Sequence, residues 1–79
     1  MSMEQNKWLD ISSEEWREYI YADGVTLRVV APTKINISPS SLGGHSHRIQ
    51  QESGRGIYVA PGWIAIRWEP KPGQPIFTF

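Results

Sequence analysis

Closely spaced turn signals constrain the fold of this chain more than any other feature. Glycine follows Asp, Gly, Ser or Pro at 23–24, 43–44, 53–54, 61–62 and 72–73, and further prolines lie between these points. The short segments that separate them are rich in aromatic and β-branched residues, which is typical of strands. We therefore expect an all-β chain, built as a small antiparallel barrel or a two-layer sandwich of roughly six or seven short strands.

The most distinct element is a hairpin centred on Asp23-Gly24, because Asp-Gly between alternating segments is a strong hairpin signal. With a two-residue loop, Ile20 faces Leu27 and Glu18 faces Val29. Glu18 then becomes a polar misfit on the core face. Alternation otherwise predicts an apolar face made of Trp16, Ile20, Ala22, Val25, Leu27 and Val29.

One helical turn near the N-terminus is an alternative for residues 13–20, because Ser12 and Glu15 fit a capping box. We prefer a strand from Trp16 onward. In the later segments, period-two alternation predicts that one set of side chains points inward: Ile35, Ile37, His47, Ile49, Gln51, Ile57, Val59, Ile64, Ile66, Trp68, Phe77 and Phe79.

The chain is short, and this limits how it can be stabilised. Its 79 residues predict a single domain, 1–79, in which residues 1–10 are disordered or arm-like. Without cysteine, disulfides and thiolate metal sites are excluded. Nine aromatic residues can supply a core, so we expect no cofactor. Exposed sheet edges make a homo-oligomer plausible.

The charge is balanced overall but unevenly placed. Residues 1–23 hold six acidic and two basic residues, whereas residues 24–79 hold six basic and two acidic ones. A neutral total disfavours nucleic acid as a partner, because nonspecific binding normally depends on basic patches. No apolar run has the length of a membrane span, and the first residues lack the pattern of a signal peptide. We therefore expect a cytoplasmic protein, of a cell or a host cell, with no membrane partner.

Both histidines lie in HSHRIQQE, residues 45–52. A His-x-His pair on a strand points to one face and can share a metal ion, with a nearby carboxylate as a further ligand. This spacing, followed by YVAPG at 58–62, resembles the first motif of the cupin family. The resemblance implies a metal held by His45, His47 and Glu52, with a partner subunit completing the shell, because a third histidine is missing. The alternative, which we prefer, is a glycine turn that leads into an ordinary strand.

Arginine and aromatic residues dominate the positions that alternation leaves outside the core. We expect these to bind a ligand or partner: Arg17, Tyr19, Tyr21, Arg28, Arg48, Arg55, Tyr58, Trp63 and Arg67. Such residues are enriched in protein interfaces, and they also suit stacking and charge pairing with nucleotides. Alternatively, cross-strand Arg–aromatic pairs only cover the sheet.

Nothing in the chain has the pattern of an enzyme, since nucleophile elbows, phosphate loops and dinucleotide fingerprints are absent. We therefore expect a non-catalytic binding module that associates with itself and with another protein. A compact all-β chain of this kind would suit an accessory protein of a virus or mobile element. The alternatives are a protein that binds or sequesters a small anionic ligand such as a nucleotide, and a cupin-like metal-binding protein.

Overall fold

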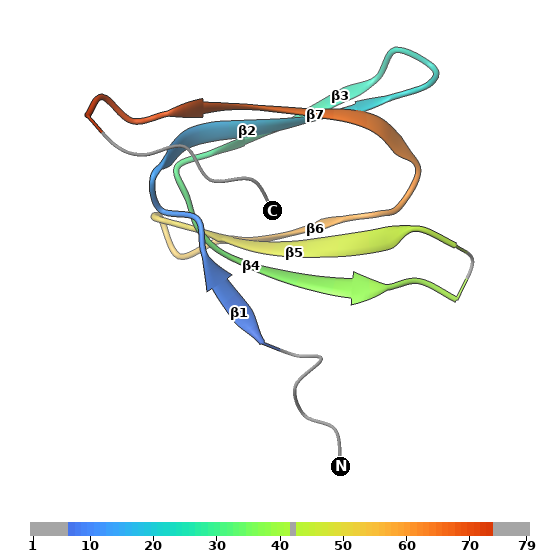
Figure 1. Cartoon of the computed structure of the whole chain (residues 1–79), viewed down its shortest axis with the longest axis horizontal. Helices are drawn as coiled ribbons and strands as arrows, with labels where there is room; N and C mark the ends of the chain where they lie inside the picture. The colour runs from blue at the N-terminus through green and yellow to red at the C-terminus, as the bar shows by residue number, and fades with distance from the viewer. Residues whose placement is uncertain (1–6, 42, 74–79) are drawn as a thin grey trace.

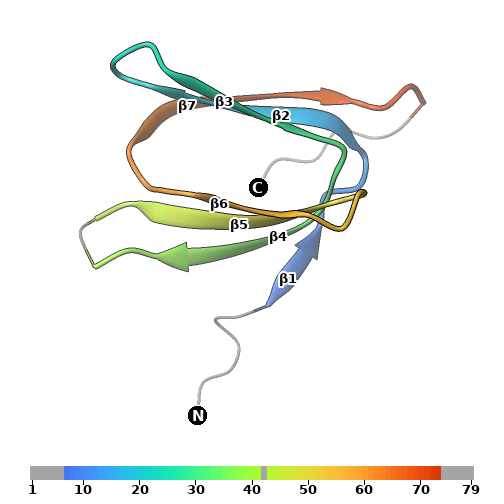
Figure 2. The same ribbon diagram turned by 180° about the vertical axis from the view of Figure 1, so that it is seen from behind.

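In the computed structural model, the described residues, 7–41 and 43–73, form seven strands and no helix. They are β1 (Trp8–Asp10), β2 (Glu14–Tyr21), β3 (Thr26–Val30), β4 (Pro32–Pro39), β5 (His45–Gln51), β6 (Gly56–Val59) and β7 (Trp63–Pro70). All pairs are antiparallel and form two sheets, β1-β4-β5-β6 and β3-β2-β7. Figures 1 and 2 show the sheets stacked face to face, so the two-layer sandwich is the correct one of the two predicted architectures.

The chain passes between the sheets at three short connections (Figure 1). The first is a turn in which the backbone N–H of Glu14 donates to the carbonyl of Ile11 at 3.1 Å. β2 starts directly after this turn, so the predicted alternative of a helix over 13–20 is wrong. Within the described part of the chain, no helix is long and apolar enough to cross a membrane.

The core lies between the two sheets, and the four-stranded sheet contributes to it as alternation predicts. Its fully buried apolar side chains include Ile35 of β4, Ile49 of β5 and Val59 of β6. Ile37 and Ile57 pack against them. A period of two therefore holds on this sheet, with inward and outward positions in the predicted order.

The three-stranded sheet departs from the prediction because its hairpin has a longer loop. The backbone N–H of Tyr21 donates to the carbonyl of Val25, and that of Gly24 donates to Tyr21, both at 2.9 Å. The loop thus has three residues, and Gly24, with φ of 90°, takes the left-handed position that such loops need. The register becomes Ile20 opposite Thr26.

This shift by one residue reverses the two faces of β2, because side chains alternate along a strand. Arg17 and Tyr19 point into the core and are buried, while Glu18 points to the outer face, where it pairs with Arg67 and is 7 % exposed. The predicted core positions Trp16, Ile20, Ala22 and Val25 are wrong, since none of these side chains is buried. On β3 the prediction is correct, because Val29 is buried and Leu27 packs against the core.

β7 carries a further irregularity near its start. Tyr19 pairs with Ile66 and Ile20 with Ala65, but Tyr21 pairs with Trp63, so Ile64 is an extra residue on this strand. Ile64 is 69 % exposed, and its predicted place in the core is wrong. Ile66 and Trp68 are half-buried. The predictions for Phe77 and Phe79 lie outside the described residues.

Residues 8–10, predicted as part of a disordered or arm-like segment, form an edge strand. β1 pairs with β4, so that Trp8 lies opposite Asn36 and Leu9 opposite Ile35. Leu9 packs against the core. This strand places Trp8 on the outer face of the four-stranded sheet, where it lines a hollow with residues of β5 and β6.

Candidate functional site

The buried face of β2 holds a chain of polar side chains that crosses between the sheets. The Glu14 carboxylate accepts two hydrogen bonds from the Arg17 guanidinium, at 2.7 and 2.9 Å. Arg17 also donates to the hydroxyl of Tyr19 at 3.3 Å, and that hydroxyl lies 2.6 Å from Nδ1 of His47 on β5. Arg17 and Tyr19 are 1 % and 0 % exposed, so their prediction as an outer binding face is wrong.

Charge and hydrogen-bond direction are well defined along this chain. Burial lowers the pKa of His47 to about 4, and the positive charge of Arg17 acts in the same direction. The imidazole is therefore neutral near pH 7, and in the tautomer with Nδ1 unprotonated the Tyr19 hydroxyl, which accepts from Arg17, donates a hydrogen bond to Nδ1. Burial also raises the pKa of Tyr19. Every member has a partner and none faces solvent, so the arrangement joins the two sheets and offers no access for a substrate.

The same contacts show whether the three residues predicted as metal ligands can bind one ion. His47 is buried with Nδ1 engaged by Tyr19, whereas His45 is exposed. His45 begins β5 and Glu52 follows its end, so a strand with a rise of about 3.3 Å per residue separates them by about 20 Å. Among the described residues, no group of three His, Cys, Asp or Glu side chains could hold a metal ion. His45, His47 and Glu52 thus do not form a ligand set.

Outside the core, the three-stranded sheet presents a row of opposite charges. Glu18 of β2 pairs with Arg67 of β7 at 2.6 Å and with Arg28 of β3 at 3.5 Å. The hydrogen bond from Arg67 holds the pKa of Glu18 below its usual value, and the charge of Arg28 adds to this effect. Arg28 also lies over the ring of Trp16, 3.9 Å from its centroid. These arginines and this ring are already engaged with one another.

The outer face of the four-stranded sheet has a different arrangement. Trp8 lies opposite Asn36, Asn36 opposite Arg48, and Arg48 opposite Tyr58, so the four residues form one row across all four strands. We call this the Trp8–Tyr58 row. Trp8 and Tyr58 are 41 % and 56 % exposed, and three interstrand spacings separate their strands, or about 14 Å.

Arg48 is the cation of this row, and it has no carboxylate partner among the residues that the structure describes. Its guanidinium lies 5.4 Å from the centroid of the Tyr58 ring. Asn36, at the centre of the row, donates from Nδ2 to the carbonyl of Lys7 at 3.0 Å and accepts from Ser38 at 3.2 Å. The centre of the face is therefore neutral, and the positive charge of Arg48 is not compensated.

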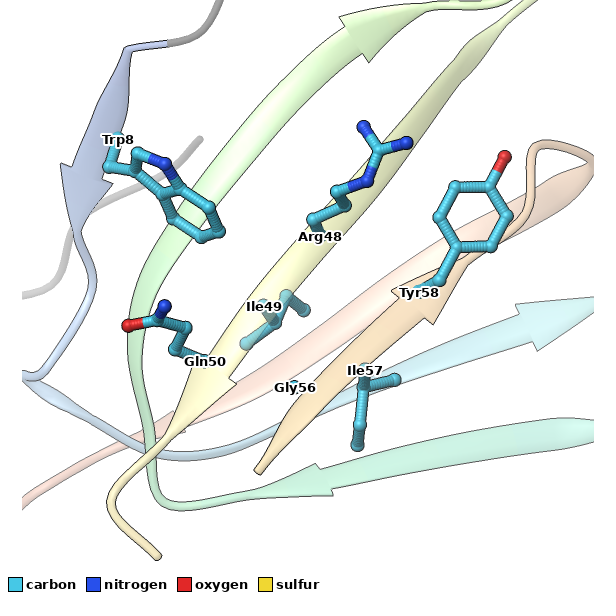
Figure 3. A pocket seen from close by; sticks show the side chains of 7 residues that line it. All are labelled: Trp8, Arg48, Ile49, Gln50, Gly56, Ile57 and Tyr58. Atoms are coloured by element: carbon cyan, nitrogen blue, oxygen red, sulfur yellow. The ribbon is translucent and has the colours of Figure 1, made fainter. Parts of the chain in front are cut away.

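A hollow of about 270 Å³ lies beside the row, and Figure 3 shows the side chains around it. Trp8 stands on one side and Tyr58 on the other, Arg48 rises from the strand between them, and Gln50 lies below Trp8 (Figure 3). Gly56 lies directly opposite Gln50 on β6 and contributes no side chain. The hollow can accept a flat group against one of the two rings, next to a cation and an amide.

The structure divides the predicted binding face among separate regions. Arg17 and Tyr19 are in the core, and Arg28 and Arg67 lie on the outer face of the three-stranded sheet. Arg48 and Tyr58 come together in the hollow.

The other predicted residues lie elsewhere. Tyr21 is half-buried, with its hydroxyl donating to the carbonyl of Ala60 at 2.9 Å, and Trp63 packs in a ring cluster with Tyr19 and His47. Arg55 is exposed in the turn before β6.

Sequence reasoning missed Trp8, Gln50 and Gly56 as parts of this site. An exposed tryptophan in KWLD, followed by an apolar residue, is a weak signal of a short edge strand, and no local pattern shows which strand it pairs with. Gly56 could have been noticed as a glycine at the start of a β-branched segment.

The chain was also compared with known proteins. No protein-family model, no curated protein and no solved structure matches it. The functional argument therefore depends on the geometry of the described residues.

Proposed function

We propose that this chain is a small, non-catalytic binding module, and that its binding site is the Trp8–Tyr58 row with the adjoining hollow. One observation carries the proposal: Arg48 lies between two exposed aromatic rings without a carboxylate partner among the described residues. Aromatic and arginine side chains are the ones that contribute most to binding energy in recognition surfaces. An uncompensated guanidinium favours a ligand or partner with negative charge.

The other three arginines that lie in strands support this choice of face. Arg17, Arg28 and Arg67 each have a glutamate within ion-pair distance, so a new anion would have to displace an existing partner. At Arg48 an anion has no such competitor among the described residues, and Asn36, opposite it on β4, adds no negative charge that would repel the anion. An anion therefore binds with the smallest loss of existing ion pairs on the four-stranded sheet.

The test is a binding screen followed by heteronuclear NMR on the 79-residue chain. The screen contains adenosine monophosphate, an acidic peptide with one tyrosine, and the chain itself at rising concentration. We expect one of these to shift the resonances of Trp8, Arg48 and Tyr58, and Arg48→Glu to remove that binding. Lys71→Glu, which changes the charge equally just beyond β7, serves as the control. Binding that survives in Arg48→Glu, or shifts confined to the three-stranded sheet, would contradict the proposal.

Self-association, a virus or mobile-element origin and a cytoplasmic location stay predictions. For self-association, the relevant feature is that β6 and β7 each pair on one side only within the described sheets. An open strand edge can pair with a second copy of the chain. Light scattering on the same samples measures this directly, and a monomer at all concentrations would contradict it.

A further inference from the structure

The hollow on the four-stranded sheet has properties that narrow the chemistry of its ligand, provided that the proposed function is correct. Its first property is a missing side chain. Gly56 lies in β6 without a positive φ, so the backbone there does not require glycine. A Cβ added at this position would meet its nearest neighbour, the carbonyl oxygen of Ile49, at 3.9 Å, which is ordinary contact. The glycine keeps space open without serving a turn, and a strand glycine of this kind often marks close approach of a ligand.

The second property is the shape and lining of this space. Backbone and apolar atoms of Ile49, Gly56 and Ile57 line it, while exposed rings of Trp8 and Tyr58 stand at its sides. A hollow of about 270 Å³ on the face of a sheet is too small and open for a large side-chain cluster, but it accommodates one planar ring system. Aromatic side chains on the open face of a four-stranded sheet are a common platform for stacking nucleobases.

The third property is the set of polar groups at the rim. Arg48 offers an uncompensated guanidinium, which can hold a phosphate through two parallel hydrogen bonds. Gln50, exposed two residues further along β5 on the same face, offers both a donor and an acceptor to the edge of a base. Lys34 lies opposite Gln50 on β4, but Asp10 lies opposite Lys34 on β1. Hydrogen bonds from Ser12 and the charge of Lys34 lower the pKa of Asp10, so this carboxylate offsets Lys34 and Arg48 is the cation that remains for a phosphate.

From these three properties we propose that the hollow binds a nucleotide unit, with the base in the hollow against an exposed ring of the row and the phosphate on Arg48. The neutral charge of the whole chain does not oppose this, because one stacked base and one phosphate contact need no extended basic patch. The shared chemistry, a nucleobase joined to a phosphate, occurs in a free mononucleotide and in a single-stranded nucleic acid. The experiment separates these two sources.

The first part of the experiment uses calorimetry with adenosine monophosphate, adenosine and a tetramer of riboadenylate. We expect adenosine monophosphate to bind about tenfold more tightly than adenosine, because only the former reaches Arg48 with a phosphate. In Arg48→Gln the two should bind equally. A tetramer that binds more tightly per molecule than the mononucleotide assigns the site to single strands, and equal affinity assigns it to free nucleotides.

The second part fills the hollow. Gly56→Leu places a side chain where the base would lie, and we expect it to weaken adenosine monophosphate at least about tenfold. The substitution sits on an exposed strand position without backbone strain, so the fold should persist, and an NMR spectrum checks this. Thr26→Leu adds the same side chain on the outer face of the other sheet and should leave binding unchanged.

The outcomes distinguish this inference from the proposed function. If neither adenosine monophosphate nor the tetramer binds at about 1 mM, or if Gly56→Leu binds them normally, the nucleotide inference is overturned. If the acidic peptide binds instead, and Arg48→Glu removes that binding, the proposed binding site is supported and only its assignment to nucleotides is wrong. If no member of the screen binds through the row, both fall.

Discussion

Arg17, Arg28 and Arg67 of the three-stranded region each lie within ion-pair distance of a glutamate, whereas Arg48 of the four-stranded sheet lies beside the Tyr58 ring and has no carboxylate partner among the described residues. The two outer faces use similar residues: Trp16 and Arg28 on one, Trp8 and Arg48 on the other. They differ in the residue at the centre of the row, which is a glutamate on the first and Asn36 on the second.

This difference shows that an Arg–aromatic pair does not by itself define a binding surface. Where a carboxylate lies between the arginines, each guanidinium already has an ion-pair partner and Arg28 lies over the ring of Trp16, so the group contributes to the structure of the sheet. Where an amide takes that place, the guanidinium keeps its charge and the rings stay exposed. Substitutions that add or remove one charge at defined positions of the two sheets test this difference.

The largest effect is expected for the buried pair of the three-stranded sheet. Arg17→Met leaves the Glu14 carboxylate buried without a counter-ion, and we expect it to lower the free energy of unfolding by about 3 to 5 kcal/mol. Urea unfolding followed by circular dichroism measures this loss. The double variant Glu14→Leu/Arg17→Met removes both charges and should recover most of the stability. If Arg17→Met is as stable as the parent chain, Glu14 and Arg17 do not form a buried ion pair.

The pH dependence of the free energy of unfolding tests whether His47, which lies where the two sheets meet, is buried in its neutral form. Because the folded state holds its pKa at about 4, below the ordinary value of about 6.5, the unfolded chain binds a proton that the folded chain does not. Stability from the neutral ring is therefore complete above pH 6.5, and it declines as pH falls toward 4. The expected loss is about 2 to 3 kcal/mol.

Urea midpoints at pH 7, 6, 5 and 4 measure this effect. His47→Phe should flatten that part of the profile, although it also removes the bond to Tyr19 and lowers stability at pH 7. His45→Asn, at an exposed ring on the same strand, should leave the slope unchanged. A parent profile that does not change between pH 6.5 and 4 would contradict the buried, neutral state of His47.

A carboxylate added next to Arg48 on the four-stranded sheet is expected to have a moderate effect on binding. Gln50→Glu places a carboxylate two residues from Arg48 on the same face of β5. We expect adenosine monophosphate to bind about three- to fivefold more weakly, with the folding stability within about 0.5 kcal/mol of the parent. Calorimetry at low salt measures the change, and the difference should shrink as salt is added. An unchanged affinity would mean that charge at Arg48 does not govern binding.

The smallest effect is expected when the carboxylate shared by two arginines on the three-stranded sheet is removed. Glu18→Gln removes the carboxylate that Arg28 and Arg67 share, so we expect weak new binding of adenosine monophosphate on the three-stranded sheet. NMR shifts of the two arginine side chains report it. Glu69→Gln, an exposed glutamate on the same strand as Arg67, is the control and should create no site. If Glu18→Gln behaves like the control, the Glu18 carboxylate is not what prevents an anion from binding to this face.

Much of the fold could be predicted from the sequence, because alternation is a local property. Ile35, Ile49 and Val59 are buried as predicted, and the turns at 53–54 and 61–62 separate strands where expected. The hairpin at Asp23-Gly24 was located correctly, but its loop length was not. Two- and three-residue loops have similar sequence signals, and a change of one residue moves Arg17 and Tyr19 from the surface to the core.

The candidate site was predicted only in part. Arg48 and Tyr58 were recognised as outward residues of neighbouring strands, which the structure confirms. Trp8 was not, because pairing of β1 with β4 joins segments far apart in the sequence, and only packing decides it. The buried chain from Glu14 to His47 was missed for a related reason: a charged residue is assigned to the surface unless its partner is known.

The sequence by itself determined the class of fold, because turn residues and two-residue alternation act through the local backbone. It also determined which residue types could recognise an anion or a ring. The tertiary structure alone decided which arginines have a carboxylate partner and which do not, since Glu18 meets Arg67 across 49 positions. Electrostatic compensation depends on distances of a few ångströms between strands, and these distances are fixed only when the register and order of the strands are set.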